Sequence, residues 1–242
     1  MIETNGIRLR TVVEGKGPLV VLLHGFPQCW YLWRHQIDPL VEAGFQLAVP
    51  DQRGYGGSDK PEQIEDYNLI ELTSDVVGLA DALGHERFFV VGHDWGAPVA
   101  WHTALLHPER IRAVDGMSVP YRRAANSSAP RQEDYGDNFW YIVYFQKPGV
   151  AEAELETDIR KSLRTTYFAV SGDTPDGAFF IKKPATAKFL DGLPDPERLP
   201  DWLTEKTSTT MCPNINRAAF VDHSTGTGIW AEMSNLLHSL RA

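Results

Sequence analysis

The segment RFFVVGHDWGAPVAWHTALLHPER, at 87–110, constrains the fold of this 242-residue chain more than any other. Its β-branched and aromatic run at 88–91 predicts a short strand that is buried on both faces. Gly92 and Gly96 bracket Asp94, and an apolar helical pattern follows. This G-x-D-x-G spacing is that of a nucleophile elbow with aspartate in place of serine. The simpler alternative is a strand-to-helix turn in which Asp94 caps the helix.

Two other loops, each directly after a predicted strand, belong beside an elbow of this kind. HGFP, at 24–27, is placed to give the backbone N–H of Phe26 to an oxyanion hole, whose second donor is the N–H of Trp95. DQRGYGGSDKP, at 51–61, resembles a dinucleotide-binding fingerprint only superficially, because an aspartate stands where the third glycine should be. We therefore interpret this second loop as a structural turn.

Strand and helix signals alternate along the first half of the chain. The expected strands lie at 7–13, 19–23, 45–49, 88–91 and 111–119, and the expected helices at 30–41, at 69–83 and after the elbow. This alternation predicts a parallel sheet with helices on both faces, and 111–119 should be an exposed edge strand. Residues 122–206 instead carry prolines, charges and short helical patterns, such as 151–170, which predict a mainly helical cap.

Taken together, HGFP, DQRGYGGSDKP and GHDWG resemble the motifs of the α/β-hydrolase-fold epoxide hydrolases. The segment YIVYFQKPGVAE, at 141–152, is similar to the start of that family's helical cap, and the likeness extends from residue 1 to about residue 206. The resemblance implies an α/β-hydrolase core at 1–120, with a mostly parallel sheet and flanking helices, and a helical cap at 121–206. It also implies a small-molecule epoxide as substrate and no cofactor.

The chemistry expected of an elbow carboxylate needs no activating base in its first step. Asp94 is ionised at neutral pH, so it can open a polarised epoxide directly and form an ester. In the resembled family a cap residue donates a hydrogen bond to the epoxide oxygen. Tyr141 matches that position, and Tyr144, one helical turn away, is the alternative. Pro27, Trp95 and Tyr144 are expected to line the substrate pocket, and a histidine oriented by an acid is expected to activate the water that hydrolyses the ester.

Dehalogenases of the same fold are the nearest alternative in chemistry. Haloalkane dehalogenases use the same elbow aspartate and also place tryptophan after it, so Trp95 does not discriminate. They tend to carry a polar halide-binding group before the proline of the HGFP loop, where this chain has Phe26. Fluoroacetate dehalogenases share HGFP but favour arginine in the place of Trp95. These differences favour epoxide hydrolysis over haloalkane or haloacid dehalogenation.

Composition narrows the class of partner and the compartment. The formal net charge of −9 argues against nucleic acid and anionic membranes as partners. The chain has 2 cysteines, no apolar stretch approaching the ~20 residues that span a bilayer, and no signal-peptide pattern at its start. We expect a cytoplasmic protein with reduced thiols. None of its 8 histidines forms a metal-ligand motif such as H-E-x-x-H, so no metal is expected.

The sequence departs from the family pattern after Lys206. In this fold an acid and a histidine follow the nucleophile, on loops after two further strands, but residues 207–242 have no matching periodicity or motif. Codons can be chosen for 206–235 that, read in another frame, spell DFDYYVPEYQQSGFRGPLNWYRDLGRNV, which is similar to the family's return from the cap. We therefore interpret 207–242 as a frameshifted, poorly ordered tail, and expect this copy to be truncated and to lack the strands, acid and histidine needed for turnover.

Asp222 and His223 are poor substitutes for that pair. Adjacent residues cannot easily form a base and the acid that orients it, and in an out-of-frame tail their identity is accidental, as is that of His238. Two hypotheses remain: a hydrolase of the epoxide hydrolase line, or a non-catalytic remnant or ligand-binding pseudoenzyme. The nucleotide sequence separates them, because a restored frame would continue into strands, an acid and a histidine.

Overall fold

The computed structural model describes residues 1–121 and 131–204. The chain divides into two compact units, Met1–Ala125 and Asn126–Ala242, and each is described by itself. The predicted frameshifted tail at 207–242 lies outside the described residues. In the described ranges, no helix combines the length and the apolar character that crossing a bilayer requires.

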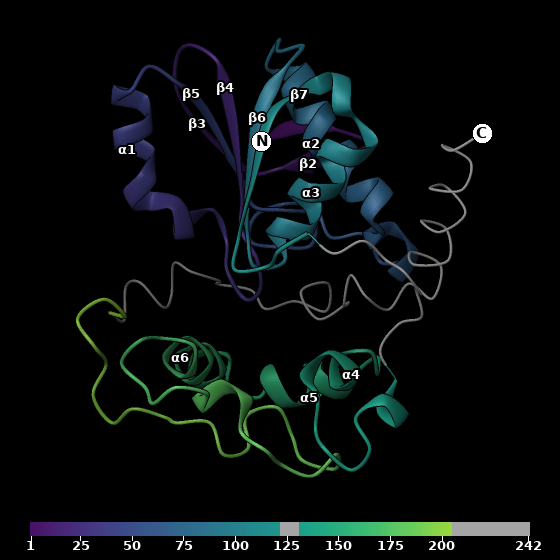
Figure 1. Cartoon of the computed structure of the whole chain (residues 1–242), viewed down its shortest axis with the longest axis vertical. Coiled ribbons are helices and arrows are strands. Elements are labelled where there is room, and N and C mark those ends of the chain that lie inside the picture. The colour runs from purple at the N-terminus through teal and green to yellow at the C-terminus, as the bar shows by residue number, and fades with distance from the viewer. Residues whose placement is uncertain (122–130, 205–242) are drawn as a thin grey trace. The chain divides into compact units, whose positions relative to one another are not determined.

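The first unit is built on a five-stranded sheet of order β3-β5-β4-β6-β7 (Figure 1). The strands are β3 (Thr11–Gly15), β4 (Leu19–Leu23), β5 (Gln46–Pro50), β6 (Phe88–His93) and β7 (Ile111–Met117). β4 pairs in parallel with β5 and β6, β7 pairs in parallel with β6, and only β3 is antiparallel to its neighbour. Every residue of β4 is buried, as expected of a central strand covered on both faces.

Helices cover both faces of this sheet. They are α1 (Arg34–Glu42), which follows a 3₁₀ turn (Trp30–Trp33), α2 (Leu69–Ala82) and α3 (Gly96–Leu106). Trp33 and Ile37 pack with Val20 and Leu47, so α1 covers one face. The helices α2 and α3 contact each other and cover the other face (Figure 1). The start of α2 is fixed by Asn68, whose side chain accepts a hydrogen bond from the Glu71 N–H over 3.0 Å.

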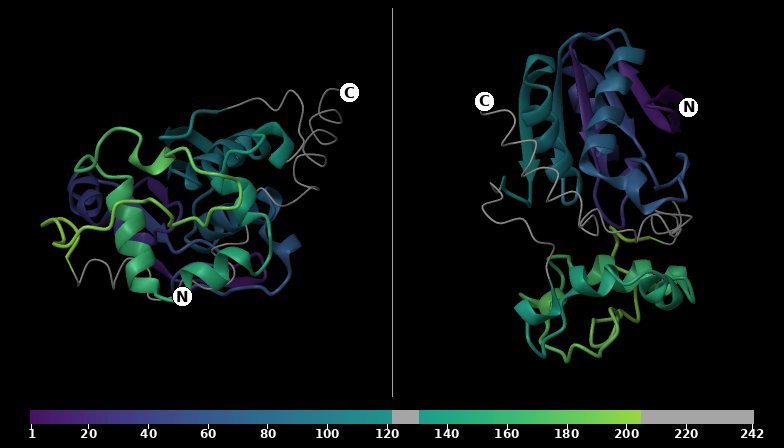
Figure 2. Two further views of the ribbon diagram at one scale, coloured as in Figure 1. Left: turned by 90° about the horizontal axis from the view of Figure 1, so that it is seen from below. Right: turned by 90° about the vertical axis from the view of Figure 1, so that its right-hand side faces the viewer.

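The N-terminus corrects one predicted strand. Residues 7–13 do not form a single strand, because β2 (Ile7–Leu9) pairs with β1 (Ile2–Thr4) in a separate antiparallel sheet and β3 pairs with β5. The hairpin turns at Asn5-Gly6, where both residues have positive φ, 43° and 75°. Asn-Gly is the preferred sequence for such a turn, so this signal was present in the chain. Figure 2 shows this small sheet beside α2, which β1 contacts.

Short helices joined by long loops make up the described part of the second unit (Figures 1 and 2). They are α4 (Tyr141–Phe145), α5 (Val150–Leu155) and α6 (Ile159–Ala169), with 3₁₀ turns at Gln132–Asp134 and Ala178–Phe180. The helical pattern at 151–170 is therefore two helices. The helix is interrupted before Asp158, whose side chain caps α6 by accepting a hydrogen bond from the Lys161 N–H over 3.0 Å. The assignment of 121–206 as a cap over the active site stays a prediction.

Among the described residues, β7 is an edge strand of the sheet, in agreement with the prediction for 111–119. It ends at Met117, two residues earlier than predicted, and Ser118 follows in a left-handed conformation with φ 71°. Arg112, Ala113 and Met117 are exposed on this strand.

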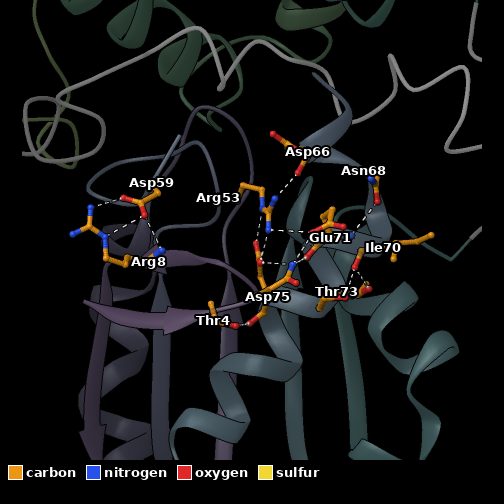
Figure 3. A network of polar contacts seen from close by, with 12 residues as sticks. Thr4, Arg8, Arg53, Asp59, Asp66, Asn68, Ile70, Glu71, Thr73 and Asp75 are labelled. Atoms are coloured by element: carbon orange, nitrogen blue, oxygen red, sulfur yellow. Dashed lines mark hydrogen bonds and ion pairs between the residues drawn. The ribbon is translucent and has the colours of Figure 1, made fainter. Parts of the chain in front are cut away.

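The loop at 51–61 holds elements of the first unit together through a polar network (Figure 3). Arg53, buried in this loop, donates to both carboxylate oxygens of Asp75 on α2, over 2.8 Å and 2.7 Å, and to the Asp66 carbonyl oxygen over 2.7 Å. Thr4 donates to the Asp75 carbonyl oxygen over 3.0 Å. These contacts support the interpretation of this loop as a structural turn, because the charged side chain of Arg53 binds groups of the protein itself.

Candidate active site

Asp94 stands at a sharp turn between β6 and α3. Its φ is 53°, a left-handed conformation that costs a residue with a side chain of the order of 1–3 kcal/mol and is typical of functional sites. Its N–H donates to the Met117 carbonyl oxygen at the end of β7 over 3.2 Å. A Cβ at Gly96 would lie 2.6 Å from the carbonyl oxygens of Leu23 and His24, so only glycine allows α3 to start this close to β4.

The two backbone N–H groups predicted for an oxyanion hole both donate hydrogen bonds to the Asp94 carboxylate. The Phe26 N–H donates to Asp94 Oδ1 over 2.9 Å, and the Trp95 N–H also forms a hydrogen bond to this side chain. A Cβ at Gly25 would collide with the same carboxylate, which explains why glycine precedes Phe26. The structure thus brings Phe26, Asp94 and Trp95 together. Pro27, which follows a cis peptide bond, is buried.

Two opposing effects set the protonation of Asp94. Burial raises the pKa of its carboxyl group, because removal from water disfavours the charged form. Hydrogen bonds from the Trp95 and Phe26 N–H groups, and the electrostatic effect of His93, act in the opposite direction, and the net pKa lies above the ordinary aspartate value. The side chain of Asp94 is half-buried.

His24 fixes the loop that carries Phe26. Its Nε2 accepts the Gln52 N–H over 2.9 Å, so Nδ1 carries the proton and donates to the Gly25 carbonyl oxygen over 2.9 Å. Gln52 Nε2 also donates to the His24 carbonyl oxygen. The imidazole is fully buried, and burial lowers its pKa, which favours this neutral tautomer. His24 therefore supports the loop and is not a base.

Sequence reasoning missed two glutamines at this site. Gln52 holds His24 from the loop after β5. Gln28 Oε1 lies 3.1 Å from the Gly25 N–H and 3.1 Å from His93 Nδ1. Both residues act through amide contacts to segments far away in the sequence, and no local pattern signals such contacts.

The two candidate tyrosines have different surroundings in the second unit. Tyr141, half-buried in the first turn of α4, packs against the rings of Phe145 and Phe179 and lines a cavity of about 50 Å³. Tyr144 donates its hydroxyl to Glu154 Oε2 over 2.7 Å, and Glu154 also accepts the backbone N–H groups of residues 189 and 190. Burial, together with Glu154, raises the pKa of Tyr144. The proton of Tyr144 is thus engaged within this unit.

Comparison with known proteins identifies the family. A family model described as the alpha/beta hydrolase fold matches residues 18–152. Epoxide hydrolase A of Mycobacterium tuberculosis is 43% identical over 228 residues, which cover 91% of this chain and 70% of the relative. Epoxide hydrolase 3 of Siraitia grosvenorii is 39% identical over 225 residues, covering 90% and 68%.

Solved structures agree with these relatives. The crystal structure of Epoxide Hydrolase A from Mycobacterium thermoresistibile has a TM-score of 0.86 and 44% identity, and the match covers 98% of this chain and 77% of that one. An epoxide hydrolase from an endophytic Streptomyces has a TM-score of 0.84 at 35% identity, with 95% and 74% covered. This chain is an α/β hydrolase and belongs to the epoxide hydrolases of that fold. It spans about 70% of the length of Epoxide hydrolase A.

Proposed function

We propose that this chain attacks a small-molecule epoxide with Asp94 and forms an alkyl-enzyme ester. The observation that carries the proposal is a carboxylate at a strained elbow, half-buried and held by the Phe26 and Trp95 N–H groups. A capping aspartate would accept N–H groups of its own helix only. The Phe26 N–H comes from a separate loop and has no role in a helix cap, so this contact favours the catalytic alternative.

Ring opening is the step that this site supports. A carboxylate oxygen of Asp94 attacks a ring carbon, the carbon–oxygen bond of the epoxide breaks, and the epoxide oxygen leaves as an alkoxide that takes a proton. We assign that proton to the Tyr141 hydroxyl. General acid assistance of this kind contributes about 10²–10⁴ in rate. The products are a 2-hydroxyalkyl ester of Asp94 and a tyrosinate that takes a proton from water.

Ester hydrolysis needs a base, because the attacking water loses a proton. Within residues 1–121 and 131–204, no histidine forms a hydrogen bond with a carboxylate, and those whose contacts are described bond to backbone groups or glutamines. We therefore propose that the reaction of this chain stops at the ester. The Phe26 and Trp95 N–H groups would stabilise the oxyanion if an external nucleophile attacked the ester carbonyl.

Mass spectrometry of the intact chain tests the proposal. Incubation with styrene oxide should add one substrate mass per chain, on Asp94, without sustained release of diol. The Asp94→Ala variant should not be labelled. Continuous diol release would contradict the arrest at the ester, and absence of an adduct on the unmodified chain would contradict the assignment of Asp94 as nucleophile.

A further inference from the structure

The position of the Phe26 N–H depends on the plane of one peptide unit. A peptide is planar, so the Gly25 carbonyl oxygen and the Phe26 N–H turn together. The carbonyl end is held by His24 Nδ1 over 2.9 Å and by the Gln28 N–H over 2.9 Å. The N–H end points at Asp94 Oδ1. Any rotation of this peptide would move the donor away from the carboxylate.

Gln28 adds a second attachment, which reaches across to the elbow. A main-chain N–H can only donate, so the Gly25 N–H fixes the amide of Gln28 with its oxygen facing the loop. The contact of the same oxygen with His93 Nδ1 then requires that His93 donate. Gly25 directly precedes Phe26 and His93 directly precedes Asp94. One amide oxygen thus ties together the residues before the oxyanion donor and before the nucleophile.

We propose that Gln28 is a positioning residue, whose amide oxygen joins the 24–27 loop to the elbow and thereby aims the Phe26 N–H at Asp94. This inference rests on the proposed function for its catalytic consequence. Gln28 does not need to touch the substrate. Its effect falls on the step that develops charge on the ester carbonyl oxygen, because the Phe26 N–H stabilises that charge.

Two variants of Gln28 distinguish the effect of its amide oxygen from the effect of the size of its side chain. Gln28→Met keeps the length of the side chain and removes the acceptor. Gln28→Glu keeps an oxygen acceptor for both donors. Gln46→Met is the matched control. Gln46 Oε1 also contacts a histidine, His85 Nε2, over 2.6 Å, but this contact lies at the start of β5. The elbow instead follows the end of β6, which runs parallel to β5 in the sheet.

The first measurement is amide hydrogen exchange of Phe26 by NMR. This N–H bonds to Asp94 and not to Gln28, so a change there reports on the aim of the peptide. Exchange should be about tenfold faster in Gln28→Met, and protection should return in Gln28→Glu. The Gln46→Met variant should match the unmodified chain. Unchanged exchange in Gln28→Met, or equally fast exchange in Gln28→Glu, would overturn the proposal.

The second measurement cleaves the ester with hydroxylamine in place of water. Its nitrogen attacks the ester carbonyl of the styrene oxide adduct, the acyl carbon–oxygen bond breaks, and the diol leaves with the proton that nitrogen gives up, so that Asp94 becomes a hydroxamate. Loss of a whole oxyanion donor costs about 10²–10³ in rate, so a misaimed donor in Gln28→Met should slow this release by about tenfold. The release rate is measured per adduct already formed, because the Phe26 N–H also donates to the carboxylate that opens the ring.

The two measurements distinguish a failure of the positioning role from a failure of the proposed function. Release from Gln28→Met at the rate of the unmodified chain would overturn the positioning role. If the unmodified chain forms no adduct, the proposed function fails, and the exchange of Phe26 still decides whether Gln28 aims this peptide.

Discussion

At Asp94, burial and hydrogen bonding change the pKa of the carboxyl group in opposite directions. The anion is the nucleophile, and burial raises the pKa of the group despite the N–H donors of Trp95 and Phe26. Protonation should therefore inactivate this residue at a higher pH than it would an exposed aspartate, whose pKa is about 3.9.

The pH profile of adduct formation tests this balance. The rate of labelling by styrene oxide should be constant at neutral pH and should fall as the pH is lowered through the raised pKa, with its midpoint above that of an exposed aspartate. Initial rates from intact mass spectra give the midpoint, and the uncatalysed opening of the epoxide in acid is subtracted with the Asp94→Ala variant. A midpoint at or below that of a free aspartate would show that the N–H donors outweigh burial.

The tyrosines of α4 give a second prediction at this scale. Tyr141→Phe removes the proposed proton donor, so labelling should slow by about 10²-fold. Tyr144→Phe removes a hydroxyl that bonds to Glu154, and labelling should change by less than about threefold. Both variants lose one hydroxyl from the same short helix, so each is the control of the other. Equal effects, or a larger one in Tyr144→Phe, would contradict the assignment.

At the scale of elements, the ion pair of Arg53 and Asp75 joins the loop after β5 to α2 in a buried place. Both residues are 3% exposed. Arg53→Met would leave the Asp75 carboxylate buried without a counter-charge, which should lower the free energy of unfolding by about 3–5 kcal/mol. Adding Asp75→Leu to that variant removes the unpaired charge and should recover much of the loss.

Figure 3 also contains the matched control for this prediction. Arg8 and Asp59 form an ion pair over 3.1 Å, but their side chains are 61% and 34% exposed. Arg8→Met should therefore lower the free energy of unfolding far less than Arg53→Met, because solvent screens an exposed ion pair. Urea unfolding of the three variants and the unmodified chain, followed by tryptophan fluorescence, provides the comparison. Similar losses in Arg53→Met and Arg8→Met would show that burial does not amplify the ion pair.

The elements also show what the sequence could predict. The elbow at 92–96 and the HGFP loop are specified locally, because glycines allow the close approach and buried strands precede them. The break at Asp158 and the Asn5-Gly6 hairpin had local signals that were missed, since apolar spacing was given more weight than a cap and a turn. No local reasoning could place Gln28 against His93, because that contact joins residues 65 positions apart and depends on the packing of β4 beside β6.

At the scale of the whole molecule, the proposed reaction draws on both units. The first supplies Asp94 and its N–H donors, and the second supplies Tyr141. Ring opening therefore tests the two units together, whereas exchange at Phe26 tests the first alone. A Tyr141→Phe variant that is labelled slowly but keeps its Phe26 protection would show that the nucleophile site forms independently of the proposed donor.

The edge strand gives the last prediction, which concerns association of whole chains. Strands at a sheet edge with unpaired backbone groups promote association, and β7 occupies an edge among the described residues. Ala113, exposed on β7, is a position where a lysine would oppose pairing between edges. The Ala113→Lys variant should scatter less light on heating than the unmodified chain.

The control for Ala113→Lys is Ala153→Lys, at an exposed position of α5. Each variant adds one positive charge to a chain of net charge −9, and moving the net charge toward zero favours association. Net charge alone thus predicts slightly more scattering for both, whereas edge pairing predicts less for Ala113→Lys only. Light scattering at matched concentrations distinguishes the two effects because they have opposite signs, and an increase in Ala113→Lys would mean that β7 does not mediate the association.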